Sequence, residues 1–430
     1  MSKSKAVAEL KVGLPVPADF VDFDDSDHKR PSNTLTNARV AVAKLEEQGM
    51  SFTYDTFRDK RYAGNVELTN ELGQISDEAI SGLQVMVRKL FNFEPGQGHM
   101  WSAVMLRCRE HSYHPVRDYL AGLGEFFGRP QLETWMIEYL GVADTKLVRY
   151  VSKMVLVASV RRIKQPGCKY DYMIVLEGPE NKGKSLGIET LYGAEFFSDQ
   201  TLLGLKDKEL QETTEGRWAI ECQELVGMRK DVEKIKAQIT RTTDRARKAY
   251  ARSVLDFPRQ CVLWGTTNES DYLRSQTGNR RFIPIRVPGM VNISGLQANR
   301  DALWCEAVEL EATGFPIWMP EHLWTAAQAE QSKRTRRDPL RDRLEDLSEY
   351  IPANATERGV YWLRDDEERV SSKWIMDEVL HIAVPDQTSE FASRLRLAME
   401  ANGWEHDDAP MRIGKKLLRG YRRPVKDFGI

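Results

Sequence analysis

Residues 178–185 read GPENKGKS and match the phosphate-loop pattern GxxxxGK[ST]. A compact apolar run with the length of a strand, Tyr172–Leu176, precedes this loop, and a helix can begin near Lys184. Glycine lets such a loop curl until its backbone N–H groups point at phosphate oxygens, and the dipole of the following helix adds positive potential. We therefore expect the phosphates of a nucleotide to contact Gly178, Pro179, Glu180, Asn181, Lys182, Gly183, Lys184 and Ser185.

Hydrolysis at such a loop needs a metal ion and an acid. Lys184 is expected to reach the β- and γ-phosphates, and the Ser185 hydroxyl to ligate Mg²⁺. An acidic side chain must lie beside the metal and polarise the attacking water. The strand Trp218–Cys222 runs toward Glu224, which we expect to take this role and to share the Mg²⁺ with Ser185. Glu221 is the alternative, although strand alternation predicts that it faces the other way.

Two later segments add candidate catalytic groups. The strand Gln260–Trp264 runs into the sequence GTTN, so Asn268 at its end can contact the γ-phosphate or the attacking water. The loop that reads TGNRRF contains the adjacent arginines Arg280 and Arg281, which suit stabilisation of negative charge on a transferred phosphate.

Positive charge is concentrated in one internal stretch. The chain has 430 residues, with 62 Lys and Arg against 64 Asp and Glu, but residues 228–252 hold nine basic and three acidic side chains. Basic groups interleaved with an aromatic ring are typical of single-strand binding. The expected contacts with single-stranded DNA are Lys236, Arg241, Arg245, Arg247, Lys248, Tyr250 and Arg252. A second block, 411–426, has seven basic residues and no acid, and it could contact duplex phosphates.

Composition excludes several classes of protein. No apolar run approaches the roughly 18–20 residues of a membrane helix, and residues 1–23 lack the apolar core of a signal peptide. The five cysteines are far apart and form no CxxC pair, which argues against a zinc cluster or a disulfide framework. Cys108, His111 and His114 lack a fourth metal ligand, and His114-Pro115 reads as a helix start. We expect a protein of the reducing cytoplasm, without a membrane segment.

Hydrophobic periodicity changes along the chain. Helical patterns follow the candidate N-cap Thr34 and recur at 77–92, 101–112, 115–127 and 130–140, with short strands near 52–54 and 66–68. After about residue 150, strands alternate with helices, which predicts a mainly parallel sheet; the run Met154–Ala158 also has strand length. Later helices are expected at 295–312, 321–347, 372–381 and 390–402, with β character at 413–421.

The predicted domains follow from these changes. They are an acidic tail at 1–32, a mainly helical N-terminal domain at 33–150, an α/β core at 151–292, a helical lid or linker at 293–347, and a winged-helix-like C-terminal module at 348–430.

The order of the motifs GPENKGKS, GRWAIECQEL, IKAQITRTTDRARKAYAR, PRQCVLWGTTNESDYL and TGNRRFIPIRV resembles the virulence-associated protein E family. That family of phage and mobile-element proteins is related to superfamily 3 helicases of the AAA+ class. The resemblance implies an AAA+ core from about His114 to Val287, with Lys184 and Ser185 as the Walker A pair. It also implies Glu224 or Glu221 as the Walker B acid, Asn268 as sensor 1, and Arg280 or Arg281 as a finger on a neighbouring subunit's ATP.

The resemblance further implies that the stretch holding Lys236, Arg245 and Arg252 lines a central channel around single-stranded DNA. The chain departs from the family pattern at three positions: Asn181 replaces an expected Gly, Leu186 an expected Thr, and Ser275 an expected Asp. No departure removes a phosphate ligand, so ATP binding is still expected.

The leading hypothesis is an ATP-dependent DNA helicase or translocase of phage or prophage replication, in the cytoplasm of a bacterial host. It would hydrolyse Mg-ATP at subunit interfaces of a homo-oligomer, most simply a hexameric ring. The alternative is an ATP-bound DNA-binding or regulatory assembly module that does not unwind DNA. A small-molecule kinase fits less well, because it has no use for the basic stretch.

Overall fold

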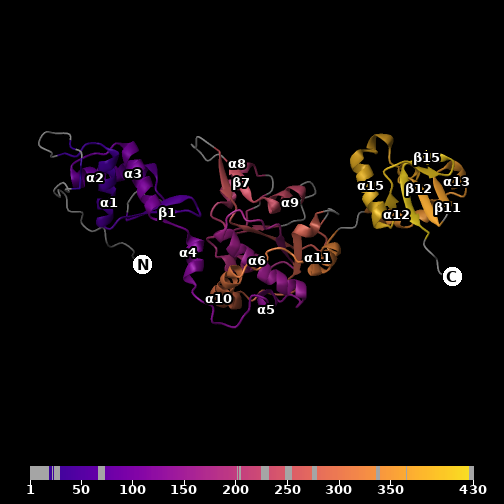
Figure 1. Cartoon of the computed structure of the whole chain (residues 1–430), viewed down its shortest axis with the longest axis horizontal. Coiled ribbons are helices and arrows are strands. Elements are labelled where there is room, and N and C mark those ends of the chain that lie inside the picture. Colours follow the sequence, from indigo (N-terminus) through magenta and orange to yellow (C-terminus); the bar gives the residue numbers. More distant parts are fainter. Residues whose placement is uncertain are drawn as a thin grey trace. The chain divides into compact units, whose positions relative to one another are not determined.

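The computed structural model of the chain describes residues 19–21, 23, 30–65, 73–200, 202, 205–223, 232–246, 254–273, 278–335, 339–364 and 366–425. These residues belong to two compact units, Met1–Ser270 with Arg280–Gln331, and Asp271–Asn279 with Ser332–Ile430. Separate hydrophobic clusters fill the N-terminal part, the parallel sheet and the second unit. Figure 1 colours the elements in chain order.

The N-terminal part combines helices with a small sheet. Its helices are α1 (Leu35–Glu47), α2 (Asp77–Phe91) and α3 (Gln97–Glu110), and its strands β1 (Ser51–Asp55), β2 (Lys60–Gly64) and β3 (Ser112–Tyr113) lie in the order β2-β1-β3. Thr34 caps α1 as predicted, because its hydroxyl accepts a hydrogen bond from the Asn37 amide at 3.3 Å. The predicted strand at 52–54 lies within β1, whereas 66–68 is outside the described residues.

Three helices lead from this part to the main sheet: α4 (Pro115–Gly122), α5 (Trp135–Leu140) and α6 (Lys146–Lys164). The run Met154–Ala158 is the middle of α6, so its interpretation as a strand was wrong. All five side chains of the run are buried, and a helix that is apolar on every side is one that the core surrounds. Side chains of α4, α5 and α6 share one hydrophobic cluster with the sheet, so the packing of the core begins before residue 150.

The central sheet has five parallel strands, as the alternation of strands and helices predicts. These are β4 (Met173–Glu177), β5 (Phe197–Ser198), β6 (Ala219–Cys222), β9 (Val262–Thr267) and β10 (Phe282–Arg286), in the order β10-β4-β9-β6-β5. β4 and β9 are buried at every position, which is typical of strands covered on both faces. Helix α10 (Ile293–Ala312) packs against α6 and α7 (Lys184–Tyr192). The carboxyl ends of β4, β6 and β9 therefore meet at one edge.

The segment between β5 and β9 contains the basic stretch. It includes α8 (Asp207–Thr214), α9 (Val232–Thr240), and an antiparallel hairpin of β7 (Thr243–Ala246) and β8 (Leu255–Pro258). β8 is followed after three residues by β9, so the hairpin is directly continuous with a central strand of the sheet. Residues 247–253, which connect the two hairpin strands, are outside the described residues.

The helix expected at 321–347 is interrupted. The structure has α11 (Glu321–Lys333), α12 (Pro339–Glu345) and a short 3₁₀ turn at Leu347–Tyr350. Pro339 is the first residue of α12, where its missing N–H costs no helical hydrogen bond. A continuous helix through this proline is therefore not formed, and the break coincides with the start of the second unit's main segment.

The second unit has an antiparallel sheet in the order β11-β12-β16-β13 and a separate hairpin, β14 with β15. Its elements are α13 (Ala355–Arg358), β11 (Tyr361–Arg364), β12 (Glu367–Ser371), α14 (Ser372–Trp374), a π-helical turn (Ile375–Val379), α15 (Ser389–Ala401), β13 (Glu405–His406), β14 (Met411–Ile413), β15 (Lys416–Leu418) and β16 (Gly420–Pro424). The helical elements between β12 and β13 are α14, the π-helical turn, a 3₁₀ turn at Val384–Asp386 and α15, and the β14–β15 hairpin lies between β13 and β16.

Across the described ranges, no helix is long and apolar enough to cross a membrane. Within the same ranges, no group of three or more His, Cys, Asp or Glu side chains is placed to hold a metal ion. His114 starts α4 as predicted, because its Nδ1 accepts a hydrogen bond from the Arg117 amide at 3.1 Å. All five cysteines are free thiols; Cys168 is half-buried and the other four are buried.

Candidate functional site

The predicted phosphate loop connects β4 to α7 at the carboxyl edge of the sheet. Gly178 follows β4 where a Cβ atom would lie 2.2 Å from the carbonyl oxygen of Val287, so only glycine fits. Gly183 caps α7 with a φ of +80°, in the left-handed region. Asn181 also has a positive φ, +56°. Asparagine tolerates this conformation better than most residues, which explains how it replaces the expected glycine.

The Lys184 ammonium is held within the loop. Its Nζ donates hydrogen bonds to the carbonyl oxygens of Gly178 at 2.8 Å and Pro179 at 2.7 Å, and to Oδ1 of Asn268 at 3.0 Å. Burial lowers the pKa of Lys184 below its usual value, while the nearby carboxylates of Glu180 and Glu221 act in the opposite direction. Three oxygen atoms therefore accept hydrogen bonds from the Lys184 ammonium, and phosphate oxygens bound in the loop would replace some of them.

The acid that lies beside Ser185 is Glu221. It comes from β6 and is fully buried, and its Oε1 accepts a hydrogen bond from the Ser185 hydroxyl at 2.6 Å and another from the Thr266 hydroxyl. Its Oε2 is buried without a hydrogen-bond partner among the described residues. Strand alternation thus turns Glu221 toward the loop, contrary to our expectation, and Glu224 is outside the described residues.

The Ser185 hydroxyl and the Glu221 carboxylate suit a magnesium ion. Mg²⁺ prefers hard oxygen ligands and usually binds through one or two carboxylates while keeping several waters. The unpartnered Oε2 of Glu221 is a buried acceptor that a hydrated cation would satisfy. These residues fit the ion that the phosphate loop implies.

Asn268 lies at the loop as predicted from its place after the strand. It follows β9, and its Nδ2 donates to Oε1 of Glu180 at 3.1 Å while its Oδ1 accepts from Lys184. Three adjacent strands, β4, β9 and β6, therefore bring Lys184, Asn268 and Glu221 to one place. Thr266 is a further member of this group that the sequence analysis missed, although the run GTTN at the strand end is the signal that contains it.

The adjacent arginines, Arg280 and Arg281, lie at the amino ends of the sheet strands, opposite the phosphate loop. They form a 3₁₀ turn, Asn279–Arg281, at the amino end of β10. Phe282, the first residue of β10, pairs with Met173, whereas Arg286 at its end pairs with Glu177 beside the loop. Arg281 precedes Arg286 by five residues, which at about 3.3 Å each places the arginine turn roughly 16 Å from the loop end of the strand. Arg280 is exposed, and neither arginine joins the group around Lys184.

The predicted DNA-contacting residues differ in exposure. Lys236 is buried in α9, and Arg241 pairs with Asp207 at 3.1 Å and with Asp244 at 3.4 Å. Arg245, on β7, is 75% exposed and only loosely paired, at 3.5 Å, with Asp256. The predicted contacts Arg247, Lys248, Tyr250 and Arg252 are outside the described residues.

A buried ion pair fixes the base of the β7–β8 hairpin. The Arg259 guanidinium donates from Nε to Oδ2 of Asp244 at 2.7 Å and from Nη2 to Oδ1 at 2.8 Å, and both side chains are 2% exposed. Arg259 also donates to the backbone oxygen of Gln238 at 2.5 Å and to its Oε1 at 2.6 Å. This cluster joins α9, β7 and the segment before β9. No motif in the sequence pointed to it.

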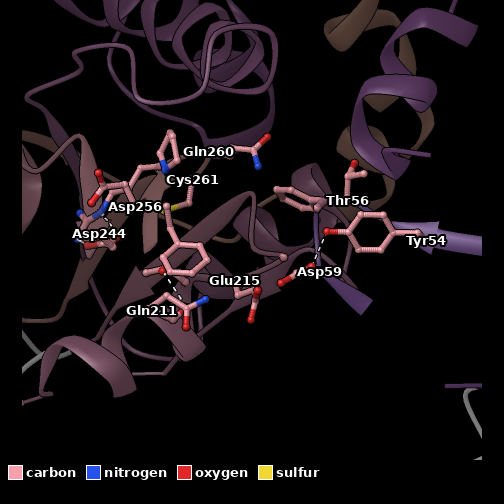
Figure 2. A pocket seen from close by; sticks show the side chains of 15 residues that line it. Tyr54, Thr56, Asp59, Gln211, Glu215, Asp244, Asp256, Gln260 and Cys261 are labelled. Carbon is pink, nitrogen blue, oxygen red and sulfur yellow. Dashed lines mark hydrogen bonds and ion pairs between the residues drawn. The ribbon is translucent and has the colours of Figure 1, made fainter. Parts of the chain in front are cut away.

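Figure 2 shows a pocket of about 260 Å³ at the amino ends of β6 and β9, the edge opposite the phosphate loop. Tyr54 and Asp59 of the β1–β2 hairpin face Glu215 and Gln260 across it, and the Tyr54 hydroxyl hydrogen-bonds to Asp59. The lining includes four carboxylates and a single guanidinium, that of Arg259. This negative charge makes the pocket unsuited to phosphate, so the carboxyl edge remains the candidate nucleotide site.

The fold and this site define a class, the α/β proteins in which a parallel sheet carries a phosphate loop between a central strand and the following helix. The virulence-associated protein E-like domain matches residues 120–336, slightly more than half of the chain. The chain belongs to this family. No curated protein sequence matches it.

Several solved structures are similar to the chain at low sequence identity. The apo structure of the NrS-1 C terminal region is 12% identical, with 89% of this chain and 98% of that chain covered and a TM-score of 0.50. A second, A form apo structure of that region is 13% identical, with coverages of 90% and 98% and a TM-score of 0.47. SCCmec type IV Cch, described as an active helicase, is 10% identical, with coverages of 87% and 92% and a TM-score of 0.35. The first of these similarities shows a shared fold.

Proposed function

We propose that this protein is an Mg-ATP-dependent DNA translocase of the helicase type, acting in phage or prophage replication. The observation that carries the proposal is the convergence of Lys184, Ser185, Glu221 and Asn268 at the carboxyl edge of three adjacent parallel strands. A charged loop lysine, a metal-binding hydroxyl and acid, and a polar strand end are the parts that phosphate-loop hydrolysis needs. Membership of the virulence-associated protein E-like family supports the assignment to mobile-element replication.

Each residue of the site has a separate role in the proposed hydrolysis. The loop amides and Lys184 would bind the β- and γ-phosphates, and Ser185 and Glu221 would hold the hydrated Mg²⁺. When bound, Mg²⁺ neutralises charge on the phosphate oxygens. Glu221 has the geometry for the metal side of the reaction, whereas Glu224 stays the candidate to polarise water. Asn268, which accepts a hydrogen bond from Lys184, would move when the γ-phosphate is bound or released, and this movement would be transmitted to β9.

The sheet geometry favours arginines that act between subunits. Arg280 and Arg281 lie roughly 16 Å from the phosphate loop of their own sheet, farther than an arginine side chain reaches. An exposed Arg280 at the opposite edge could instead contact ATP held by a second copy. Repetition of one such head-to-tail contact generates a ring where the rotation between neighbours closes, and we propose a ring of six subunits.

The β7–β8 hairpin supports contact with single-stranded DNA. Its connecting residues include the predicted contacts Arg247, Lys248, Tyr250 and Arg252, and exposed Arg245 stands on its first strand. β8 is followed after three residues by β9, the strand that directly precedes Asn268. A displacement of Asn268 during hydrolysis could therefore reach the hairpin through β9 and the three residues that join it to β8.

The second unit supports a winged-helix-like module that contacts duplex DNA. The order β12-β16-β13, with helices between β12 and β13 and a hairpin between β13 and β16, is the arrangement we expect of such a module. The β14–β15 hairpin and its flanks expose Arg412, Lys415, Lys416 and Arg419. Arg422 and Arg423 on β16 are instead paired with Glu367 and Glu368, so the hairpin is the better candidate for phosphate contact.

ATP hydrolysis with and without single-stranded DNA tests the proposal. We expect phosphate release that rises severalfold when an oligonucleotide is added, and loss of that activity in Lys184→Ala. Val85→Ala, which truncates an exposed side chain on α2, is the matched control and should behave as wild type. No phosphate release with or without DNA would refute the motor. ATP binding and DNA binding without hydrolysis would favour the alternative, an assembly module that does not unwind DNA.

A further inference from the structure

One segment outside the sheet runs along the phosphate loop. Residues 287–293 run from the end of β10 into the first residue of α10, and hydrogen bonds fix this segment at two points. The Val287 amide donates to the carbonyl oxygen of Glu177 at 2.8 Å, and the Val291 amide donates to that of Lys182 at 2.9 Å. Between these anchors lie residues 288–290, which belong to no helix or strand.

The loop and helix α7 leave room for this segment. A Cβ atom on Gly183 would lie 3.5 Å from Val291, and one on Gly187 would lie 3.3 Å from the same side chain. The Asn292 amide donates to the carbonyl oxygen of Tyr139 at 2.8 Å, and the Asn292 side chain caps α10. The segment is therefore a preorganised wall of the phosphate loop.

Two apolar side chains at this wall are exposed. Met290 is 68% exposed and precedes the anchor Val291, and Leu186 is 50% exposed on the first turn of α7, beside Gly187. Leu186 adjoins Gly187 and Met290 adjoins Val291 in the chain, and Gly187 and Val291 are the two residues that approach each other closely. Isolated exposed apolar residues are ordinary on a protein surface. Two exposed apolar side chains beside a phosphate loop place an apolar surface next to the nucleoside that is attached to the phosphates.

The strand order fixes the direction in which a bound nucleotide extends. The γ-phosphate end must lie beside Lys184, Asn268 and Glu221. Asn268 follows β9, Glu221 is on β6, and the Lys184 ammonium is hydrogen-bonded to Asn268. These strands are on one side of β4, and β10 is on the other. A nucleoside attached to the far end of the phosphate chain therefore extends toward β10 and the 287–293 segment.

We propose that Leu186 and Met290 form the binding surface for the base of the nucleotide, with the purine ring of ATP as the occupant. This inference rests on the proposed function, because it requires phosphates in the loop. The flat faces of a purine are apolar, and the flexible thioether of methionine adapts to them well. Leu186, which stands where the family pattern has threonine, thus gains a role in this chain.

Calorimetric titration of the full chain in MgCl₂ tests the inference, with ATP and inorganic tripolyphosphate as the two ligands. Tripolyphosphate fills the loop but has no base. Met290→Ala and Leu186→Ala are each expected to weaken ATP binding about five- to tenfold, from the apolar area that they remove, and to leave tripolyphosphate binding unchanged. Met290→Leu should retain most of the affinity for ATP, and Val85→Ala should change the affinity for neither ligand.

The outcomes separate this inference from the proposed function. If the wild-type chain binds neither ligand, the nucleotide site itself is refuted. If the chain binds both ligands and Met290→Ala and Leu186→Ala leave the affinity for ATP unchanged, or weaken both ligands equally, the base surface is refuted while the phosphate site stands. Sedimentation velocity on the same samples adds a further check. A loss of ATP affinity that appears only together with loss of assembly would assign Met290 to a subunit contact and overturn the inference.

Discussion

Removal of the Asp244 carboxylate is the sharpest test of how the hairpin is held. In the folded chain this group accepts two hydrogen bonds from Arg259, and both side chains are almost completely buried. Asp244→Ala leaves the guanidinium buried without its counter-charge. Loss of one partner from a buried pair typically costs about 3–5 kcal/mol. Gln238 still accepts two hydrogen bonds from Arg259, so we expect the lower end of that range, about 3 kcal/mol.

The same hairpin provides a matched control. Arg245 and Asp256 are also an arginine–aspartate pair between β7 and β8, but they are 75% and 68% exposed and 3.5 Å apart. An exposed pair contributes about 0–1 kcal/mol, so Asp256→Ala should change the free energy of unfolding by less than about 1 kcal/mol. The two variants remove the same chemical group from the same hairpin and differ in burial.

Urea unfolding followed by tryptophan fluorescence measures the effect, because Trp218 and Trp264 are buried at the neighbouring strands β6 and β9. The double variant Asp244→Leu with Arg259→Met is expected to be less destabilised than the sum of the two single variants, since it leaves no buried charge. Equal shifts for Asp244→Ala and Asp256→Ala would refute the reasoning. So would a double variant whose loss equals the sum of the single losses.

Three further perturbations test the nucleotide site and the core. Glu221→Gln should keep ATP binding and slow phosphate release by at least about 10²-fold, because it removes the negative charge beside Ser185 while keeping its shape. Arg280→Ala should be inactive alone and regain activity when mixed with Lys184→Ala, since a mixed interface can pair an intact loop with an intact arginine. Burial lowers the pKa of His114 below its usual 6.5, so the unfolded chain binds more protons below that pH and stability should fall as the pH decreases through about 6.5. Urea midpoints of wild type and His114→Gln at about pH 7.5 and 5.5 measure this last effect.

Each of these expectations has a contrary outcome. Phosphate release by Glu221→Gln within a factor of ten of wild type would leave Glu224 as the essential acid. No recovery on mixing would mean that the arginines do not act between subunits. A pH dependence that is identical in wild type and in His114→Gln would show that the ring does not supply the loss of stability.

The phosphate loop and the central strands could be predicted from the sequence because their signals are local. A glycine pattern followed by Lys-Ser, and apolar runs bounded by polar turns, need no knowledge of distant contacts. β10 carries a weaker local signal, since Pro284 removes a backbone donor and argues against a strand. Its position at the edge of the sheet explains why the proline is tolerated.

The remaining features depend on contacts between residues far apart in the chain. We expected strand alternation to turn Glu221 away from the loop, and this was wrong. Which face of β6 lies toward the loop depends on Ser185 and Thr266, which belong to other elements. The run Met154–Ala158 is continuous and apolar, which suits a buried strand and a buried helix equally. The Arg259–Asp244 pair belongs to no motif, and only the fold brings its members together.

The shielding of the native thiols has a practical consequence. Burial raises the pKa of Cys108 to about 11 and that of Cys222 to about 12, and it raises the pKa of Cys168, Cys261 and Cys305 as well. Thiolate is the reactive form, so these groups react slowly with maleimides at neutral pH. A single cysteine introduced at Val254, which is half exposed where the hairpin enters β8, could then carry a fluorophore in the otherwise native chain. Its emission would follow the hairpin in real time as nucleotide is added.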